Sequence, residues 1–193
     1  MADNKKKQAT WTEVKAVLSK MRREELLGTI DALYKLRKEN KQFLHTRFQL
    51  GEDILDNYKL QISKGVNPVK GQISFRNARQ AISEYKKASG DLDGLAELMV
   101  YYCKECVNAI KRFGVWEQYA VATMNIWQET LKHLTKLSKD KQIHYWKELA
   151  SAQNKLGDVG WGLSDDVSDI MYEYSPINEE EEEEESLDVD DMW

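Results

Sequence analysis

The spacing of apolar residues constrains this chain most strongly, because they recur at steps of three and four along almost its whole length. No part of the chain shows a convincing alternation of apolar and polar residues, the pattern that indicates a strand. In the stretch 95–113 the apolar residues cover so wide an arc that we expect a helix buried on most sides, at the centre of the domain. Its two stripes are Leu95, Met99, Tyr102, Cys106, Ile110 and Phe113, and Ala96, Val100, Cys103 and Val107.

Local start and stop signals divide the chain into helices. Thr10 followed by Glu13 is a capping-box pattern, and Ser74 and Asp91 or Asp93 are further candidate N-caps. The predicted helices cover about 10–19, 26–37, 43–51, 52–63, 75–88, 95–113, 116–136, 139–156 and 164–174, with an expected break in the stretch 37–40. Their predicted ends are marked by Gly51, by Gly65 with Pro68, by Gly114 and by Pro176, and Ser164 is expected to cap the last helix.

These helices predict an all-α fold. The chain has 193 residues but only ten glycines and two prolines, which disfavours turn-rich all-β folds. Because the connections are short, neighbouring helices should be antiparallel, so we expect a single helical bundle or a short stack of antiparallel helical hairpins. We predict a flexible basic N-terminus at 1–9, the all-α domain at 10–176 and a disordered acidic tail at 177–193.

The acidic tail opposes the rest of the chain in charge. Residues 178–193 hold ten acids and no base, so subtraction from the totals of 28 bases and 33 acids leaves about +5 on residues 1–177. A block of seven glutamates repels itself and buries nothing. The tail either improves solubility, visits a basic face as a counter-charge, or attracts a basic partner. Met192 and Trp193 are candidate anchors if it docks.

A basic surface is predicted in the middle of the chain. Between Lys59 and Ser89 there are seven bases and one acid, Glu84. Arg76, Arg79 and Lys86 share one stripe of the predicted helix 75–88, beside its apolar stripe. The candidate basic face consists of Lys59, Lys70, Arg76, Arg79, Lys86 and Lys87.

A glycine-rich turn offers a candidate pocket. Gly160 and Gly162 flank Trp161, and two carboxylates follow at the start of the last predicted helix. Trp161, Asp165 and Asp166 could line a pocket. The alternative is that the two aspartates occupy the first helical turn because the helix dipole favours acids there.

The two cysteines form a C-x-x-C, Cys103 to Cys106. Redox use would need a thioredoxin-like βαβ setting, and a zinc site would need about four nitrogen or sulfur ligands. His45, His133 and His144 are the only other soft donors. Both cysteines lie on apolar stripes, so we interpret them as core residues, with a metal or redox site as the alternatives.

The sequence also excludes several classes. It contains no nucleophile-elbow or phosphate-loop motif and no apolar run of about 18 residues, so we expect no cofactor of those types and no membrane span. The first ten residues lack the apolar stretch of a secretory signal. Two cysteines do not suggest a disulfide scaffold, and we expect a reducing, cytoplasmic location.

Two stretches carry a resemblance: Leu33-Tyr34-Lys35-Leu36 through Glu39–Phe48, and Ala78–Ala88 with Asp91 and Gly94–Met99. In that order, and with the Gly160-Trp161-Gly162 turn and Asp165-Asp166, the chain resembles a family of small bacterial all-helical proteins of unknown function over roughly residues 20–170. The resemblance implies a bacterial source and an all-α domain. It brings no activity, cofactor or catalytic residue.

From these observations we expect a non-catalytic protein-interaction module with a basic helical face and an acidic tail, binding another protein. One alternative is a nucleic-acid-binding protein autoinhibited by its tail, although no recognition motif appears. A second alternative is an enzyme of unknown reaction with its pocket near Trp161. The sequence leaves the oligomeric state open.

Overall fold

The computed structural model describes residues 9–157, 159–160 and 162–176, which form α-helices joined by short connections. No strand occurs among these residues, which confirms the all-α prediction. The helices are α1 (Trp11–Leu18), α2 (Arg23–Leu36), α3 (Lys38–Phe48), α4 (Ile54–Val66), α5 (Phe75–Ala88), α6 (Leu92–Phe113), α7 (Glu117–Leu134), α8 (Lys139–Leu156) and α9 (Leu163–Glu173).

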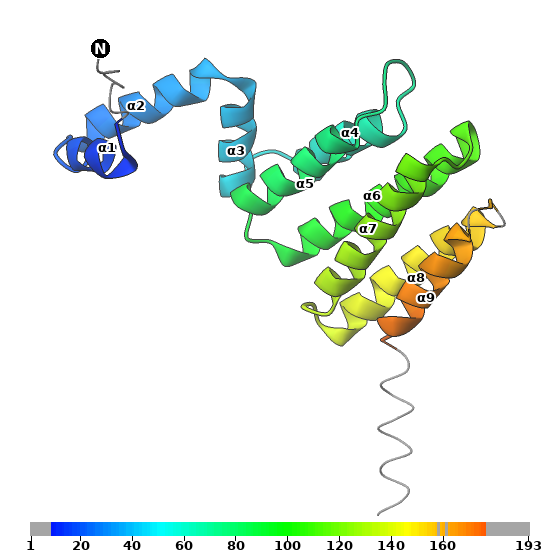
Figure 1. Ribbon diagram of the computed structural model, residues 1–193. Helices are drawn as coiled ribbons and strands as arrows, with labels where there is room; N and C mark the ends of the chain where they lie inside the picture. Colours follow the sequence, from blue (N-terminus) through cyan, green and yellow to red (C-terminus); the bar gives the residue numbers. More distant parts are fainter. Residues whose placement is uncertain (1–8, 158, 161, 177–193) are drawn as a thin grey trace, which may run out of the picture.

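Helices α4 to α9 form a stack of antiparallel hairpins around α6 (Figure 1). Helix α6 packs against α4, α7 and α8, and α9 covers α7 and α8 on the outer side. Both apolar stripes of α6 are buried almost throughout, as its wide apolar arc predicted. Large, fully enclosed side chains fill the centre, among them Leu98, Tyr102, Trp127 and Leu149.

Several local signals are confirmed at atomic detail. Thr10 and Glu13 form the capping box, with the Thr10 amide donating to the Glu13 carboxylate at 2.7 Å. The Ser74 hydroxyl accepts the Asn77 amide at 3.3 Å, and Asp91 accepts the Asp93 amide at 3.0 Å. The expected break also occurs, because Arg37 has an extended backbone between α2 and α3.

Several predicted boundaries were wrong. Helices α2, α3 and α6 begin three to five residues earlier than predicted, at Arg23, Lys38 and Leu92. Helix α4 continues past Gly65 to Val66, and Gly65 is a buried packing position rather than a helix end. Helix α3 ends before Gly51, with Gln49 in the left-handed region at φ 53°. Gly162, not Ser164, is the N-cap of α9, also with a left-handed backbone at φ 64°.

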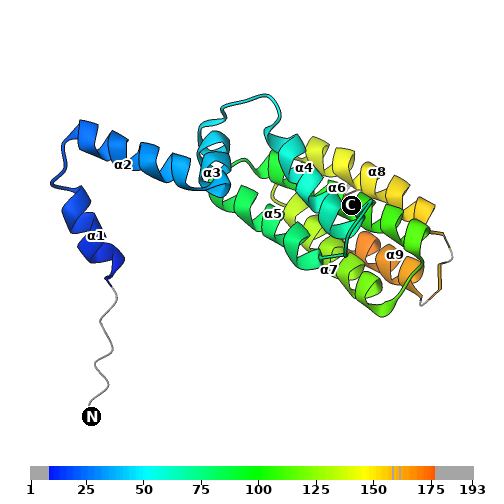
Figure 2. The same cartoon turned by 90° about the horizontal axis from the view of Figure 1, so that it is seen from above.

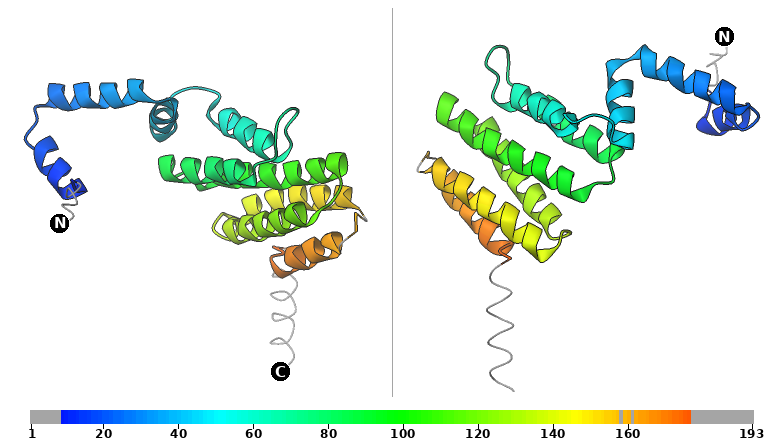
Figure 3. Two further views of the ribbon diagram at one scale, coloured as in Figure 1. Left: turned by 45° about the horizontal axis from the view of Figure 1, so that its top comes forward. Right: turned by 180° about the vertical axis from the view of Figure 1, so that it is seen from behind.

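The first two helices project from this stack as an arm, which we define as α1 and α2, residues 11–36 (Figures 2 and 3). Neither helix buries a single residue. Helix α3 joins the arm to the stack, since α3 packs against α2 on one side and α5 on the other. The Tyr34 hydroxyl lies 3.0 Å from His45 Nε2 and links α2 to α3.

Candidate functional site

Helix α5 presents a basic face that is partly as predicted. Arg76, Arg79 and Lys86 are spaced by three and seven residues, so they share one side of the helix. Arg76, Lys86 and Lys87 are exposed and have no carboxylate at ion-pair distance within the described residues. These three cations are therefore free to meet an anionic partner.

The other predicted cations are not part of this free face. Arg79 donates to both Glu129 carboxylate oxygens, at 2.8 and 3.1 Å, and ties α5 to α7. Lys59 donates to Glu97 at 2.6 Å, and this hydrogen bond raises the Lys59 pKa. Lys70 lies in the connection between α4 and α5, at the opposite end of α5 from Lys86. The six cations thus do not form one surface.

A patch that sequence reasoning missed lies where α3 meets the last turn of α5. Arg47 Nη2 donates to the Lys87 carbonyl at 2.9 Å, and the Arg47 guanidinium lies 5.5 Å from the Phe43 ring centre. The Phe43 side chain remains 41% exposed. We call Phe43, Arg47, Lys86 and Lys87 the basic–aromatic patch. Arg47 and Lys87 are forty residues apart in the sequence, so the patch forms only when α3 packs against α5.

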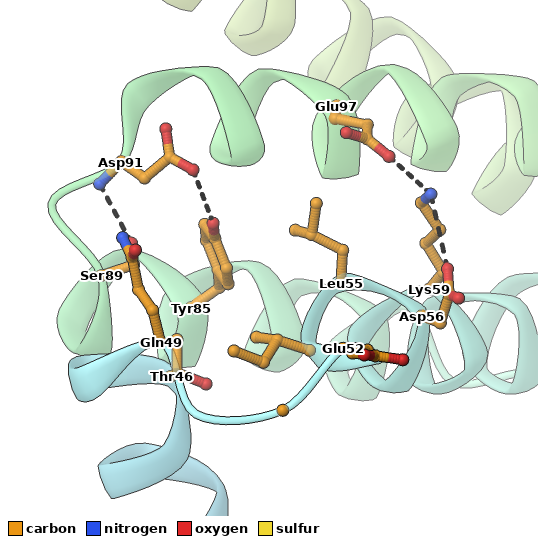
Figure 4. A pocket seen from close by; sticks show the side chains of 12 residues that line it. Thr46, Gln49, Glu52, Leu55, Asp56, Lys59, Tyr85, Ser89, Asp91 and Glu97 are labelled. Carbon is orange, nitrogen blue, oxygen red and sulfur yellow. Dashed lines mark hydrogen bonds and ion pairs between the residues drawn. The ribbon is translucent and has the colours of Figure 1, made fainter.

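A cleft of about 400 Å³ opens between the α3–α4 connection, α4 and the turn from α5 to α6 (Figure 4). The Tyr85 hydroxyl donates to Asp91 at 3.2 Å, and burial raises the Tyr85 pKa to about 12. Lys59 is held between Glu97 and Asp56 on the other side. The charged groups that line the cleft are Glu52, Asp56, Asp91 and Glu97, with Lys59 as the single cation.

Several of the groups that line the cleft are paired with one another. The Lys59 ammonium lies at its edge with two carboxylates, and burial raises the pKa of Tyr85 to about 12, further above neutral pH than its ordinary value of 10.0. Within the described residues, no three histidine, cysteine or acidic side chains are placed to hold a metal ion. Lys59, Tyr85 and the three carboxylates that they contact are therefore held together by hydrogen bonds and ion pairs.

The cysteines are core residues, as interpreted from their stripes. Both are free and fully buried, and Cys103 Sγ lies 3.4 Å from Thr130 Oγ1. Burial raises the pKa of both thiols, that of Cys106 to about 12. A reactive thiolate at neutral pH is therefore disfavoured.

The histidines do not complete a metal site with these thiols. Buried His133 bonds through Nε2 to the Leu92 carbonyl at 2.8 Å. His144 is exposed and lies 3.5 Å from Glu148. His45 serves the contact between α2 and α3. Each histidine therefore makes its own contact in a different part of the structure, and none of these contacts is with a cysteine.

The predicted pocket at the glycine turn gains no support. Asp165 and Asp166 are exposed in the first turn of α9, where the helix dipole favours acids. Trp161 lies outside the described residues, as do the predicted tail anchors Met192 and Trp193. The pocket and the anchors therefore stay predictions.

The arm supplies the largest set of exposed apolar side chains. At about 100° per residue, the α2 residues Leu27, Ile30 and Leu33 fall on one side of the helix, together with Leu26 and Tyr34. Leu27, Ile30 and Leu33 are 54, 46 and 51% exposed. On α1, Trp11, Val14 and Val17 are exposed as well.

No described helix combines the length and the hydropathy that crossing a membrane requires. No family model matches the chain, and neither a curated protein nor a solved structure shows significant similarity to it. The resemblance to small bacterial helical proteins therefore stays a prediction.

Proposed function

We propose that this protein is a non-catalytic protein-interaction module whose arm docks into an apolar groove of a partner protein. The observation that carries the proposal is the apolar side of α2, where Leu27, Ile30 and Leu33 stay about half exposed. Gly28, Ala32 and Lys35 lie on its opposite side, and Glu24 and Asp31 border the apolar side next to Leu27. An amphipathic helix of this kind is recognised through anchors spaced by three and four residues.

The free energy of the arm should be lower when a partner protein buries its apolar side than when that side faces water. Isolated helices shorter than about 12–15 residues are marginal in water. Helix α1 has 8 residues and α2 has 14, and neither buries any residue. Full burial of a leucine or isoleucine side chain contributes about 1.5–3 kcal/mol. Three anchors entering a groove would therefore stabilise both the helix and the complex.

The two alternatives from the sequence have less support. Nucleic-acid binding relied on six cations, of which Lys59 and Arg79 are held by carboxylates. Enzymatic activity relied on a pocket whose Asp165 and Asp166 are exposed at a helix start. Neither alternative uses the exposed apolar side of α2, whereas protein binding does.

Site-specific photo-cross-linking in the cells that make the protein tests the proposal. A photoreactive residue at Ile30, on the apolar side, should link a defined partner protein. The matched position Ala32 is exposed on the opposite side of α2 and should link none. A double substitution, Leu27→Glu with Leu33→Glu, should abolish the product at Ile30 by placing charge in the groove.

Three results would contradict the proposal. The first is equal cross-linking from Ile30 and Ala32, which indicates random collision. The second is a product that contains only a second copy of this chain, which indicates self-association. The third is a product unaffected by the double substitution while circular dichroism shows unchanged helix content.

A further inference from the structure

The basic–aromatic patch combines three cations with an accessible ring. Arg47, Lys86 and Lys87 have no carboxylate at ion-pair distance within the described chain. Phe43 lies beneath the Arg47 guanidinium and keeps 41% of its surface exposed. Such a surface suits a segment that carries several carboxylates and a few apolar side chains. The carboxylates would pair with the cations, and an apolar side chain would pack on the exposed ring.

The end of α9 lies at the same end of the helix stack as this patch (Figure 1). Trp146 Nε1, in the middle of α8, donates to the Met171 carbonyl at 3.3 Å near the end of α9. Near the start of α8, Lys141 pairs with Asp93 at 2.7 Å, and Asp93 lies in the first turn of α6. Helix α6 follows the last turn of α5 directly. The chain beyond α9 thus begins at the end of the stack where α5 ends and α6 begins, on the side of α7 and α8.

The length of that chain is sufficient for contact. Residues 177–193 lie outside the described range and number seventeen. At about 3.3 Å per residue, seventeen residues span up to about 56 Å. The path from α9 across α8 and α6 to α5 crosses three helix–helix spacings of about 8–10 Å, or about 30 Å in all. The segment can therefore reach Lys86 and Lys87 of its own chain.

We propose that the C-terminal segment, residues 178–193, docks on the basic–aromatic patch of the same chain. The segment holds ten acids and no base, and its apolar residues are Leu187, Val189, Met192 and Trp193. The carboxylates meet Arg47, Lys86 and Lys87, and an apolar side chain covers Phe43. This contact is independent of the arm and its partner, because it uses α3 and α5.

Because the C-terminal segment is part of the same chain, it should occupy the patch in preference to a free anionic molecule. A tether of this length holds the segment at an effective concentration of about millimolar order near the patch. A free polyanion such as a nucleic acid must displace the segment before it reaches Lys86 and Lys87. The contact is electrostatic and near the surface, so salt should weaken it.

Zero-length cross-linking with a carbodiimide tests the proposal on the full-length protein, because the reagent joins touching carboxylates and lysine amines as amides. Mass spectrometry should find acids of residues 179–191 joined to Lys86 or Lys87. Yields should fall by about tenfold at about 0.5 M salt. Lys64, Lys70 and Lys111 lie toward the opposite end of the stack and should give little product.

A matched pair of variants isolates the patch. Arg47→Gln removes one patch cation, leaves both lysine amines in place and should lower the yield at Lys86 and Lys87 several-fold. Arg47→Lys should restore it. Arg76→Gln removes an exposed cation from the first turn of α5, at the far end of that helix, and should change nothing.

Mixing isotopically light and heavy chains separates the sources of the product. Links within one chain at Lys86 or Lys87 support the proposal. Products that only join light to heavy chains overturn it, as do equal yields at the three distant lysines or no links to the patch. Failure here leaves the photo-cross-linking result at Ile30 untouched, so the two proposals fail separately.

Discussion

Helices α2 and α6 have the same kind of sequence pattern but opposite surroundings. Both carry apolar side chains at steps of three and four, as the local sequence predicts. Helix α6 buries thirteen of its 22 residues, whereas α2 buries none of its fourteen. Periodicity therefore specifies that a helix forms and which side is apolar. It does not specify what covers that side.

The largest expected difference between these two regions concerns leucine truncation. Leu98→Ala on α6 removes a side chain that is 0% exposed and should cost about 2–5 kcal/mol of unfolding free energy. Leu33→Ala on α2, where Leu33 is 51% exposed, should cost under about 0.5 kcal/mol. Urea titration followed by tryptophan fluorescence measures both. Equal losses would show that the arm is packed in solution.

A smaller effect is expected from crowding a buried glycine. A Cβ at Gly65 would lie 2.9 Å from both the Ala78 amide nitrogen and the Ser74 carbonyl oxygen. Because both atoms are backbone, α4 and α5 must separate, and Gly65→Ala should cost about 1–3 kcal/mol. Thermal unfolding measures the loss. A variant as stable as the parent would disprove the close approach of the two helices.

The same substitution at the glycine of the arm should stabilise its helix, whereas at Gly65 it destabilises the protein. Gly28 lies inside α2, and a Cβ there would meet nothing within 4 Å. Gly28→Ala should therefore favour the helix by about 1 kcal/mol, since alanine has the higher helix propensity. Amide hydrogen exchange within residues 23–36 should slow. Unchanged or faster exchange there would contradict a solvent-exposed helix.

The smallest effect concerns a charge pair at the surface of the bundle, Asp93 with Lys141. The hydrogen bond from Lys141 lowers the Asp93 pKa below its ordinary value of 3.8. Its contribution is therefore present above about pH 4 and is lost as pH falls through the lowered pKa. The Asp93 side chain is 41% exposed, so the contribution should stay under about 1 kcal/mol.

Asp93→Asn tests this pair. At pH 7 the variant should be slightly less stable than the parent, and the difference should shrink as the pH falls below about 4. Urea titrations at several pH values measure it. An unchanged difference at pH 3 would show that the charge of Asp93 does not contribute.

Local sequence signals predicted most helix boundaries because the groups that satisfy a helix end lie within three residues of it. Thr10 with Glu13, Ser74 and Asp91 cap helices where expected. The exceptions are informative. Gly65 was interpreted as a helix end, but the nearness of Ala78 on α5 explains the glycine, and a helix contact of that kind leaves no trace in the local pattern.

The candidate surfaces were less predictable than the helices. Spacing within α5 correctly placed Arg76, Arg79 and Lys86 on one side, yet it could not show that Glu129, fifty residues later, pairs with Arg79. It also could not bring Arg47 and Phe43 to Lys87. Ion pairs and patches between helices depend on how the helices pack, which no window of the sequence contains.

The sequence by itself determined that this protein is helical, where most helices begin and end, and which sides are apolar or basic. Hydrogen bonds within a helix and caps near its ends are short-range, so neighbouring residues suffice to specify them. Tertiary structure alone decided that α6 is enclosed, that the apolar side of α2 stays open, and which cations remain unpaired. Burial and long-range charge pairing arise only when segments distant in the sequence meet.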